Sequence, residues 1–251
     1  KKEIEYLLIG DSFTHGSCVN RPNDISSVLR NLSNKSVLNL GMSGNEPLIE
    51  YATLREYLNT NIKKVLWIYY EGNDLVGIEN EKKNNTLINY LNDLNFTQNL
   101  KLKKNETDIL SRQIINEKSQ FNFIYFLKLS ETRTILNNLP KGQKQSKSTI
   151  HDINEFKKII LLAKKLVEKN NSKLYFVYLP EYSRYKTKYD NTYYSLIKNF
   201  VTELNITFID IHNEIFKKEK NPLKLFPFEM LGHYNIEGYK KVAESIFKLS
   251  K

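Results

Sequence analysis

Five short apolar runs constrain the fold of this chain more than any other feature of its sequence. Each run is followed by a Gly, Pro or Asp residue within two positions, and they are Tyr6–Ile9, Val37–Leu40, Val65–Tyr70, Leu174–Leu179 and Ile206–Ile209. Continuous β-branched and aromatic runs of this length are typical of strands that are buried on both faces of a parallel sheet. We therefore predict a central parallel sheet of about five strands.

Segments with a helical hydrophobic period lie between these runs. Residues 46–59 place Pro47 near the first turn of a predicted helix, and residues 153–169 carry an apolar stripe. A final helix over about 236–249 follows Asn235, which suits an N-cap. The alternation of strands and helices predicts a three-layer α/β/α sandwich with right-handed crossovers.

Residues 79–150 interrupt this alternation. They hold polar helical segments rich in lysine and asparagine, followed by a loop at Pro140–Lys147. We interpret residues 1–251 as one domain that carries a helical insertion at about 79–150. The insertion is either a cap over the functional site or a peripheral pair of helices.

The charge balance leaves several classes of partner open. The 38 Lys and Arg residues against 28 Asp and Glu give a net charge of +10, which suits nucleic acid, an anionic membrane surface or an acidic substrate. Because the lysines are scattered, we interpret them as a solvated surface and expect no nucleic-acid partner. The oligomeric state stays open.

The single cysteine and the short apolar runs argue against a disulfide, a CxxC motif and a transmembrane segment. Cys18 alone excludes an intrachain disulfide and any CxxC motif for a metal or for redox chemistry. No apolar run approaches the ~20 residues that span a bilayer, so we expect no transmembrane segment. A soluble domain of the cytoplasm or the cell envelope is the resulting expectation.

Small and polar residues follow three of the predicted strands. These segments are Gly10–Gly16, Asn39–Asn45 and Glu71–Asp74, and a fourth, Gly232–Asn235, precedes the final helix. Ligands bind beyond the carboxyl ends of the strands in open α/β sheets. The four segments therefore predict one shared site.

These residue types suit acyl transfer through a serine. Ser12, on a tight strand-to-helix turn, lies in a favourable field for a developing anion. His233 can take the serine proton and return it to the leaving group. The N–H groups of Ser12 and Gly44 and the side-chain amide of Asn73 can form an oxyanion hole, in which one donor is worth ~3–4 kcal/mol of barrier. We expect neither a cofactor nor a metal.

In these four blocks the chain resembles the SGNH hydrolase superfamily of GDSL-like esterases and acyltransferases, named for Ser, Gly, Asn and His. The resemblance implies Ser12 as the nucleophile, Gly44 and Asn73 as oxyanion donors, and His233 as the base. The blocks stand in the order of the family from residue 10 to residue 233 and span nearly the whole chain. The resemblance also implies the α/β/α fold of the family.

One position departs from the pattern of the family. The family usually has an aspartate three residues before the histidine, where it orients the imidazole, but Met230 stands there in this chain. The group that orients His233 must then come from elsewhere. Glu229, Asp210 and a backbone carbonyl, which would leave a Ser–His dyad, are the candidates.

The expected function is serine-dependent hydrolysis of an acyl ester through an acyl-serine intermediate. We expect a short acyl group, such as acetyl, on a small molecule or a glycan. Transfer of the acyl group to a glycan hydroxyl is one alternative. A non-catalytic carbohydrate-binding domain that has lost the orienting aspartate is another, which the intact Ser12, Gly44, Asn73 and His233 oppose.

Overall fold

The computed structural model describes residues 3–75, 77–119, 150–186 and 188–251. The chain divides into two compact units, one formed by Lys1–Phe96 with Ser148–Lys251 and the other by Thr97–Lys147. In the second unit the structure describes one long helix, α6 (Lys104–Ser119). Every other element described below belongs to the first unit.

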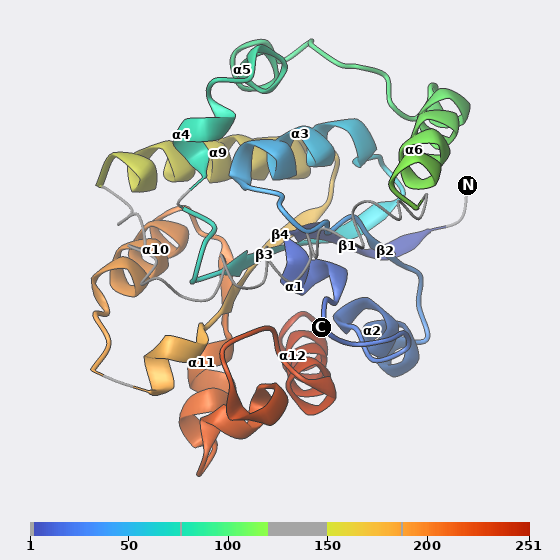
Figure 1. Cartoon of the computed structure of the whole chain (residues 1–251). Coiled ribbons are helices and arrows are strands. Elements are labelled where there is room, and N and C mark those ends of the chain that lie inside the picture. The colour runs from blue at the N-terminus through green and yellow to red at the C-terminus, as the bar shows by residue number, and fades with distance from the viewer. Residues whose placement is uncertain (1–2, 76, 120–149, 187) are drawn as a thin grey trace, which may run out of the picture. The chain divides into compact units, whose positions relative to one another are not determined.

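The first unit contains a five-stranded sheet in the order β2-β1-β3-β4-β5, and every pairing is parallel. The strands are β1 (Ile4–Gly10), β2 (Val37–Asn39), β3 (Ile62–Tyr70), β4 (Lys173–Leu179) and β5 (Thr207–Asp210) (Figure 1). The five predicted strands are therefore confirmed. β3 begins before its apolar run, where Lys64 forms an ion pair with Glu5 of β1 at 2.8 Å.

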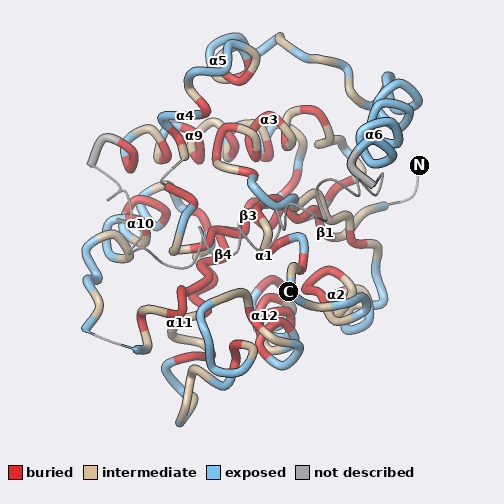
Figure 2. The backbone as a smooth tube through the Cα atoms, viewed as in Figure 1, coloured by how far each residue is buried: buried red, intermediate tan, exposed pale blue. Residues whose placement is uncertain are grey.

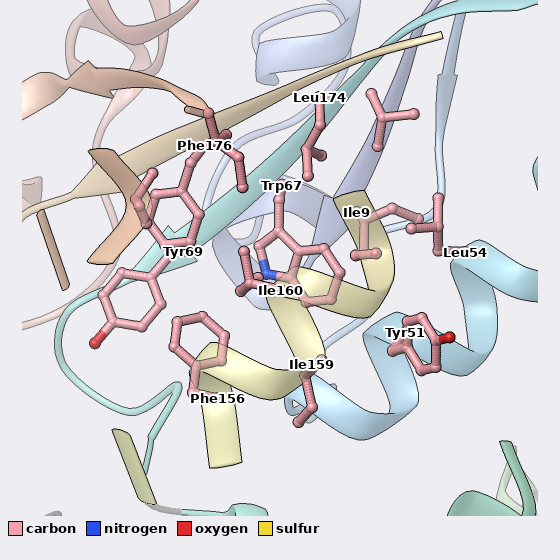
Figure 3. Packing of buried hydrophobic residues seen from close by; sticks show 14 of the residues in the cluster. Ile9, Tyr51, Leu54, Trp67, Tyr69, Phe156, Ile159, Ile160, Leu174 and Phe176 are labelled. Atoms are coloured by element: carbon pink, nitrogen blue, oxygen red, sulfur yellow. The ribbon is translucent and has the colours of Figure 1, made fainter. Parts of the chain in front are cut away.

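Three helices cover one face of the sheet. They are α3 (Pro47–Tyr57), α9 (Ile150–Lys169) and α10 (Thr192–Glu203). Trp67 of β3 is fully buried on this face, and Figure 3 shows it beside Ile160 of α9. The helices α3 and α9 confirm the helices predicted over residues 46–59 and 153–169.

The opposite face of the sheet packs against α2 (Ile25–Ser33) and α12 (Ile236–Leu249). Leu8 of β1 and Ile68 of β3 lie on this face. Their neighbours along each strand lie on the first face, because successive side chains of a strand point to opposite sides. Figure 2 shows that β3 and β4 are almost wholly buried. The predicted three-layer α/β/α sandwich is confirmed.

The strand order places the functional segments together. The chain steps from β1 outward to β2 and then returns to β3 on the other side of β1. In sheets of this topology the ligand crevice lies outside the carboxyl ends of the two strands at this switch point. Asp11 and Ser12 follow β1, and Glu71 to Asp74 follow β3, so both segments lie at the crevice.

The predicted insertion at 79–150 contains, among its described residues, most of α4 (Ile78–Glu81), all of α5 (Asn85–Asn92) and α6. The helices α4 and α5 belong to the first unit. The loop predicted at Pro140–Lys147 lies outside the described residues. Whether the insertion is a cap or a peripheral pair of helices stays a prediction.

Candidate active site

Ser12 opens the short helix α1 (Ser12–His15) directly after β1. Gly10 is needed for this turn, because a Cβ atom there would come within 2.7 Å of the Ile68 carbonyl oxygen in β3. Asp11 caps the helix by accepting a hydrogen bond of 2.8 Å from a backbone N–H of the first turn. The partly exposed serine hydroxyl is thus fixed at the start of a helix.

The fold joins Ser12 to His233 across 221 positions of sequence, with His233 Nε2 2.8 Å from Ser12 Oγ. This distance is that of a hydrogen bond and meets the geometric requirement for a general base. Burial lowers the pKa of His233, and the charge of Asp11 opposes this shift. The imidazole is therefore neutral at neutral pH and able to accept a proton.

Aromatic side chains hold the His233 ring in place. The Phe13 ring centroid lies 4.5 Å from that of the imidazole, and Phe13 stacks on Tyr70 at 3.9 Å. Tyr234 is fully buried, and its hydroxyl donates a hydrogen bond of 2.6 Å to the Pro180 carbonyl. Phe13 and Tyr234 have no predicted role, and their positions directly after the serine and the histidine are the signal that points to them.

The second ring nitrogen of His233 faces a thiol. Nδ1 lies 3.5 Å from Cys18 Sγ, within the range of a hydrogen bond to sulfur. Cys18 has φ = +70°, a conformation that few non-glycine residues adopt. The neighbouring Ser17 carbonyl accepts a hydrogen bond of 3.0 Å from the Tyr239 hydroxyl, which ties this segment to α12. From the sequence, Cys18 serves only to exclude an intrachain disulfide and a CxxC motif. Its position in the sequence gives no sign of the contact with His233.

The structure does not bring either candidate carboxylate to His233. Glu229 is exposed, has φ = +55°, and its Oε1 accepts a hydrogen bond of 3.3 Å from Asn221 Nδ2. Asp210 accepts one of 2.6 Å from the Tyr194 hydroxyl at the end of β5. Among the described residues, the hydrogen-bond partners of the imidazole are Ser12 and Cys18, so no backbone carbonyl fills this place either.

Gly44 lies in the exposed loop after β2 with φ = +85°, a conformation that favours glycine. Asn39 ties the start of this loop to the serine turn, because its Nδ2 donates to the Thr14 carbonyl at 2.7 Å. Asn45 ties the other end, because its Nδ2 donates to the Gly10 carbonyl at 3.3 Å. The loop that carries Gly44 is therefore bonded on both sides to the segment that carries Ser12.

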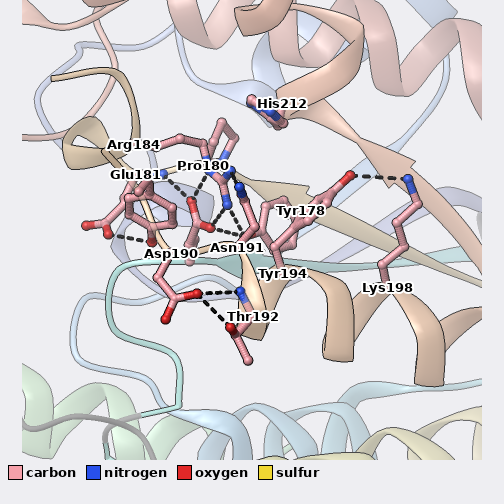
Figure 4. Close-up of polar contacts among 12 residues, drawn as sticks. Tyr178, Pro180, Glu181, Arg184, Asp190, Asn191, Thr192, Tyr194, Lys198 and His212 are labelled. Atoms are coloured by element: carbon pink, nitrogen blue, oxygen red, sulfur yellow. Dashed lines mark hydrogen bonds and ion pairs between the residues drawn. The ribbon is translucent and has the colours of Figure 1, made fainter. Parts of the chain in front are cut away.

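Asn73 lies exposed in the turn after β3, and its side chain is near enough to the Asp11 carboxyl to help lower the pKa of that group. Asp74 accepts a hydrogen bond of 2.6 Å from the last backbone N–H of β3. Glu71 forms a buried ion pair with Arg184, whose contacts Figure 4 shows. The turn is thus held by buried carboxylates on both sides of Asn73.

Asp11 connects these parts of the site. Its side chain is almost fully buried, and its Oδ2 lies 3.2 Å from Ser12 Oγ, as a second acceptor for the hydroxyl hydrogen besides His233. Burial raises the pKa of Asp11, while the hydrogen bond from the start of α1 and the nearby Ser12, His233 and Asn73 side chains oppose that rise. One carboxylate therefore lies beside the serine and the start of α1 and acts electrostatically on the histidine.

Several buried carboxyl groups surround the start of α3. Glu81 of α4 accepts hydrogen bonds of 2.8 and 3.0 Å from the N–H groups of Leu48 and Ile49 and so caps α3. Burial raises the pKa of Glu81 to about 7. Burial and the charge of Glu81 raise the pKa of Glu46 to about 7 as well, and burial raises that of Glu50 strongly. The stability of this region therefore depends on pH.

The predicted site residues thus fall into two groups. Ser12, His233 and the loop of Gly44 are linked by hydrogen bonds, Asn73 lies near the Asp11 carboxyl, and Glu229 is apart from them. In the described ranges no group of three or more His, Cys, Asp or Glu side chains could hold a metal ion. The same ranges contain no helix with both the length and the hydropathy needed to cross a membrane.

Known structures share this fold. An acetyl xylan esterase, AlAXEase, matches with a TM-score of 0.56 and 15% identity over 98% of each chain. The lipase/acylhydrolase from Enterococcus faecalis matches with a TM-score of 0.55 and 12% identity, covering 98% of this chain and 94% of that one. A member of the lipolytic protein G-D-S-L family from Veillonella parvula matches with a TM-score of 0.53 and 13% identity over 98% and 97%.

No family model and no curated protein matches this sequence. At identities this low, the structural likeness shows the fold. The fold is that of the SGNH, or GDSL-like, proteins, and it extends over nearly the whole chain. The resemblance found in four sequence blocks is therefore confirmed at the level of the fold.

Proposed function

We propose that this protein hydrolyses an acyl ester through an acyl-serine intermediate on Ser12. The observation that carries the proposal is the 2.8 Å contact between Ser12 Oγ and His233 Nε2, at the carboxyl end of the sheet. A neutral histidine at this distance from a serine is the arrangement that activates the hydroxyl as a nucleophile. The esterases that share the fold support ester hydrolysis.

In the first half of the reaction, Ser12 Oγ attacks the ester carbonyl carbon while His233 Nε2 takes the hydroxyl proton. The tetrahedral intermediate collapses, the bond to the alcohol oxygen breaks, and His233 gives its proton to the leaving alcohol. In the second half, water attacks the acyl-serine and gives a proton to His233, which returns it to Ser12 as the acid leaves.

The oxyanion receives hydrogen bonds from the N–H groups of Ser12 and Gly44 and from the Asn73 amide. An amide NH₂ carries two hydrogens. Since Asn73 lies near the Asp11 carboxyl, one hydrogen can face that group while the other serves the oxyanion. Donors that are fixed before the reaction need no reorganisation as the charge develops.

We also propose that the acyl group is short, such as acetyl. Support comes from the acetyl xylan esterase that shares the fold, whose name states an acetylated glycan as its substrate. Transfer to a glycan hydroxyl would use the same acyl-serine and differ only in the acceptor. Product analysis with and without a sugar acceptor therefore separates hydrolysis from transfer.

The test compares the parent with Ser12→Ala on p-nitrophenyl esters of graded chain length and on acetylated xylan oligosaccharides. The parent should cleave the acetyl ester fastest and react with a fluorophosphonate probe, and Ser12→Ala should do neither. Ser33→Ala, which removes a hydroxyl from α2, is the matched control and should behave as the parent. A Ser12→Ala protein with parental activity would overturn the assignment.

A further inference from the structure

The loop Leu225–Asn235 exposes three large apolar side chains directly before His233. Phe228 is 93% exposed, Leu231 72% and Met230 63%. We call these three residues the apolar tip. Single exposed apolar residues are ordinary, but each one left in water forgoes the free energy of burial, so a group of them marks an interaction surface.

The loop that carries the apolar tip is closed by hydrogen bonds. Asn235 N donates to the Leu225 carbonyl at 2.9 Å, and Asn235 Nδ2 donates to the Lys224 carbonyl at 2.7 Å. The Tyr182 hydroxyl donates to the Glu229 carbonyl at 2.8 Å, within the loop. Leu225 is buried at the base of the loop. The exposure of the apolar tip is therefore a property of a defined conformation.

The backbone at the apolar tip is unfavourable by itself. Phe228 has φ = +54° and Glu229 has φ = +55°. The left-handed conformation is unfavourable for residues other than glycine, and asparagine tolerates it best. Neither the exposed side chains nor this backbone favours folding, so a binding role gives them a physical reason.

Residues 220–235 carry a net charge of +1, from Lys220 and Lys224 against Glu229. Lys220 and Lys224 are exposed on the approach to the loop, and in the described part of the chain neither forms an ion pair. Glu229, the carboxylate of the loop, accepts a hydrogen bond from Asn221. The whole chain has a net charge of +10. Apolar side chains beside unpaired lysines are the composition that binds anionic lipid surfaces.

We propose that the apolar tip docks this protein on an anionic lipid surface. Phe228, Met230 and Leu231 enter the headgroup region, while Lys220 and Lys224 contact the anionic phosphates. Because His233 follows the tip by two residues, docking holds the Ser12–His233 pair at the lipid surface. The ester is then one carried by a lipid or another amphiphile, a statement that rests on the proposed function, whereas the docking does not.

The test is co-sedimentation of the full chain with vesicles. Vesicles of phosphatidylcholine mixed with phosphatidylglycerol should bind the protein, and pure phosphatidylcholine vesicles should bind it more weakly. The tip variant, Phe228→Asn with Met230→Gln and Leu231→Gln, should lose at least about tenfold in affinity. Lys220→Gln and Lys224→Gln should each lose about fivefold on the anionic vesicles alone.

Leu94→Asn, which removes a 70% exposed leucine that follows α5, is the matched control and should bind as the parent does. Thermal unfolding checks that every variant is folded. Each measurement is repeated in the Ser12→Ala background, so binding is read without turnover. A failure of docking then leaves hydrolysis of soluble esters intact, and a failure of hydrolysis leaves docking intact.

Three results would overturn the proposal. The parent could fail to bind anionic vesicles, or the tip variant could bind them as tightly as the parent. Sedimentation could also show an oligomer that dissociates in the tip variant without any vesicle binding, which would assign the apolar tip to contact between copies of the chain.

Discussion

Cys18 Sγ lies 3.5 Å from His233 Nδ1, the ring nitrogen that does not contact Ser12. A carboxylate usually stands here in proteins with this arrangement, where it fixes the tautomer and stabilises the imidazolium. A neutral thiol can orient the ring, but it supplies no full negative charge. The carboxylate whose charge acts on His233 is Asp11, on the serine side.

The first prediction concerns this thiol. Cys18→Ala should lower kcat about fivefold, the effect of losing one weak hydrogen bond to the histidine. Cys18→Asp should raise the pKa of His233, because a nearby carboxylate favours the imidazolium. The acidic limb of the kcat/KM profile, where activity rises as His233 loses its proton, should then move to higher pH. Unchanged kcat and pH profile in both variants would show that Cys18 does not orient the imidazole.

The burial of His233 also determines the pH of the acidic limb of the kcat/KM profile in the parent protein. Since burial lowers the pKa of His233, activity should rise with pH below the usual histidine value of 6.5. Cys18→Ser, which keeps a weak donor and acceptor, is the control and should preserve this profile.

The second prediction concerns Glu229. Its carboxylate bonds to Asn221 and is exposed, so Glu229→Gln should change kcat by less than about twofold. Steady-state kinetics on p-nitrophenyl acetate measures this. A tenfold fall in kcat would mean that Glu229 reaches His233 during the reaction.

The third prediction concerns Asn73. Asn73→Ala should lower kcat by ~10²–10³ with little change in KM, because the donor acts mainly in the transition state. Asn80→Ala, on α4, removes a similar side chain and should leave both constants unchanged. A rise in KM at constant kcat would instead assign Asn73 to binding of the substrate in its ground state.

The fourth prediction concerns the stability of the folded chain. The pKa of Glu46 is about 7 when folded, against an ordinary value of 4.5, so the folded state binds its proton more tightly. The free energy of unfolding should therefore fall as pH rises from 4.5 to about 7. Glu46→Gln should remove this loss and stabilise the protein above pH 7 by about 1–2 kcal/mol, which raises Tm by ~2–5 °C.

Thermal unfolding followed by circular dichroism at both ends of this pH range measures the effect. Glu79→Gln, an exposed glutamate of α4, is the matched control and should leave the pH dependence as it is. Equal Tm values for the parent and Glu46→Gln above pH 7 would contradict the assigned pKa.

The strands could be predicted, and the proposed site residues selected, because their signals are local. Strands buried on both faces show as continuous apolar runs, and Ser12, Gly44, Asn73 and His233 stand in short blocks of recognisable composition. The helix α10 could not be predicted in the same way, because only Ile197, Phe200 and Val201 are buried in it.

The environment of His233 could not be predicted because it depends on distant backbone geometry. Cys18 reaches the imidazole across 215 positions of sequence, from a residue with φ = +70°. The neighbours of Met230 in sequence suggest Glu229 as the partner of His233, but its positive φ and the contact with Asn221 keep it apart. Sequence spacing therefore proposes His233 as the base without proposing the group that orients it.

The distance along the chain between Ser12 and His233 has a consequence for synthesis. Ser12 leaves the ribosome early, whereas His233 is synthesised later, in the segment that leads into α12. The Tyr239 hydroxyl must also reach the Ser17 carbonyl before that segment is tied to the loop of Cys18. Under the proposed mechanism, a nascent chain therefore lacks the Ser12–His233 pair until this segment has folded onto the rest of the sheet.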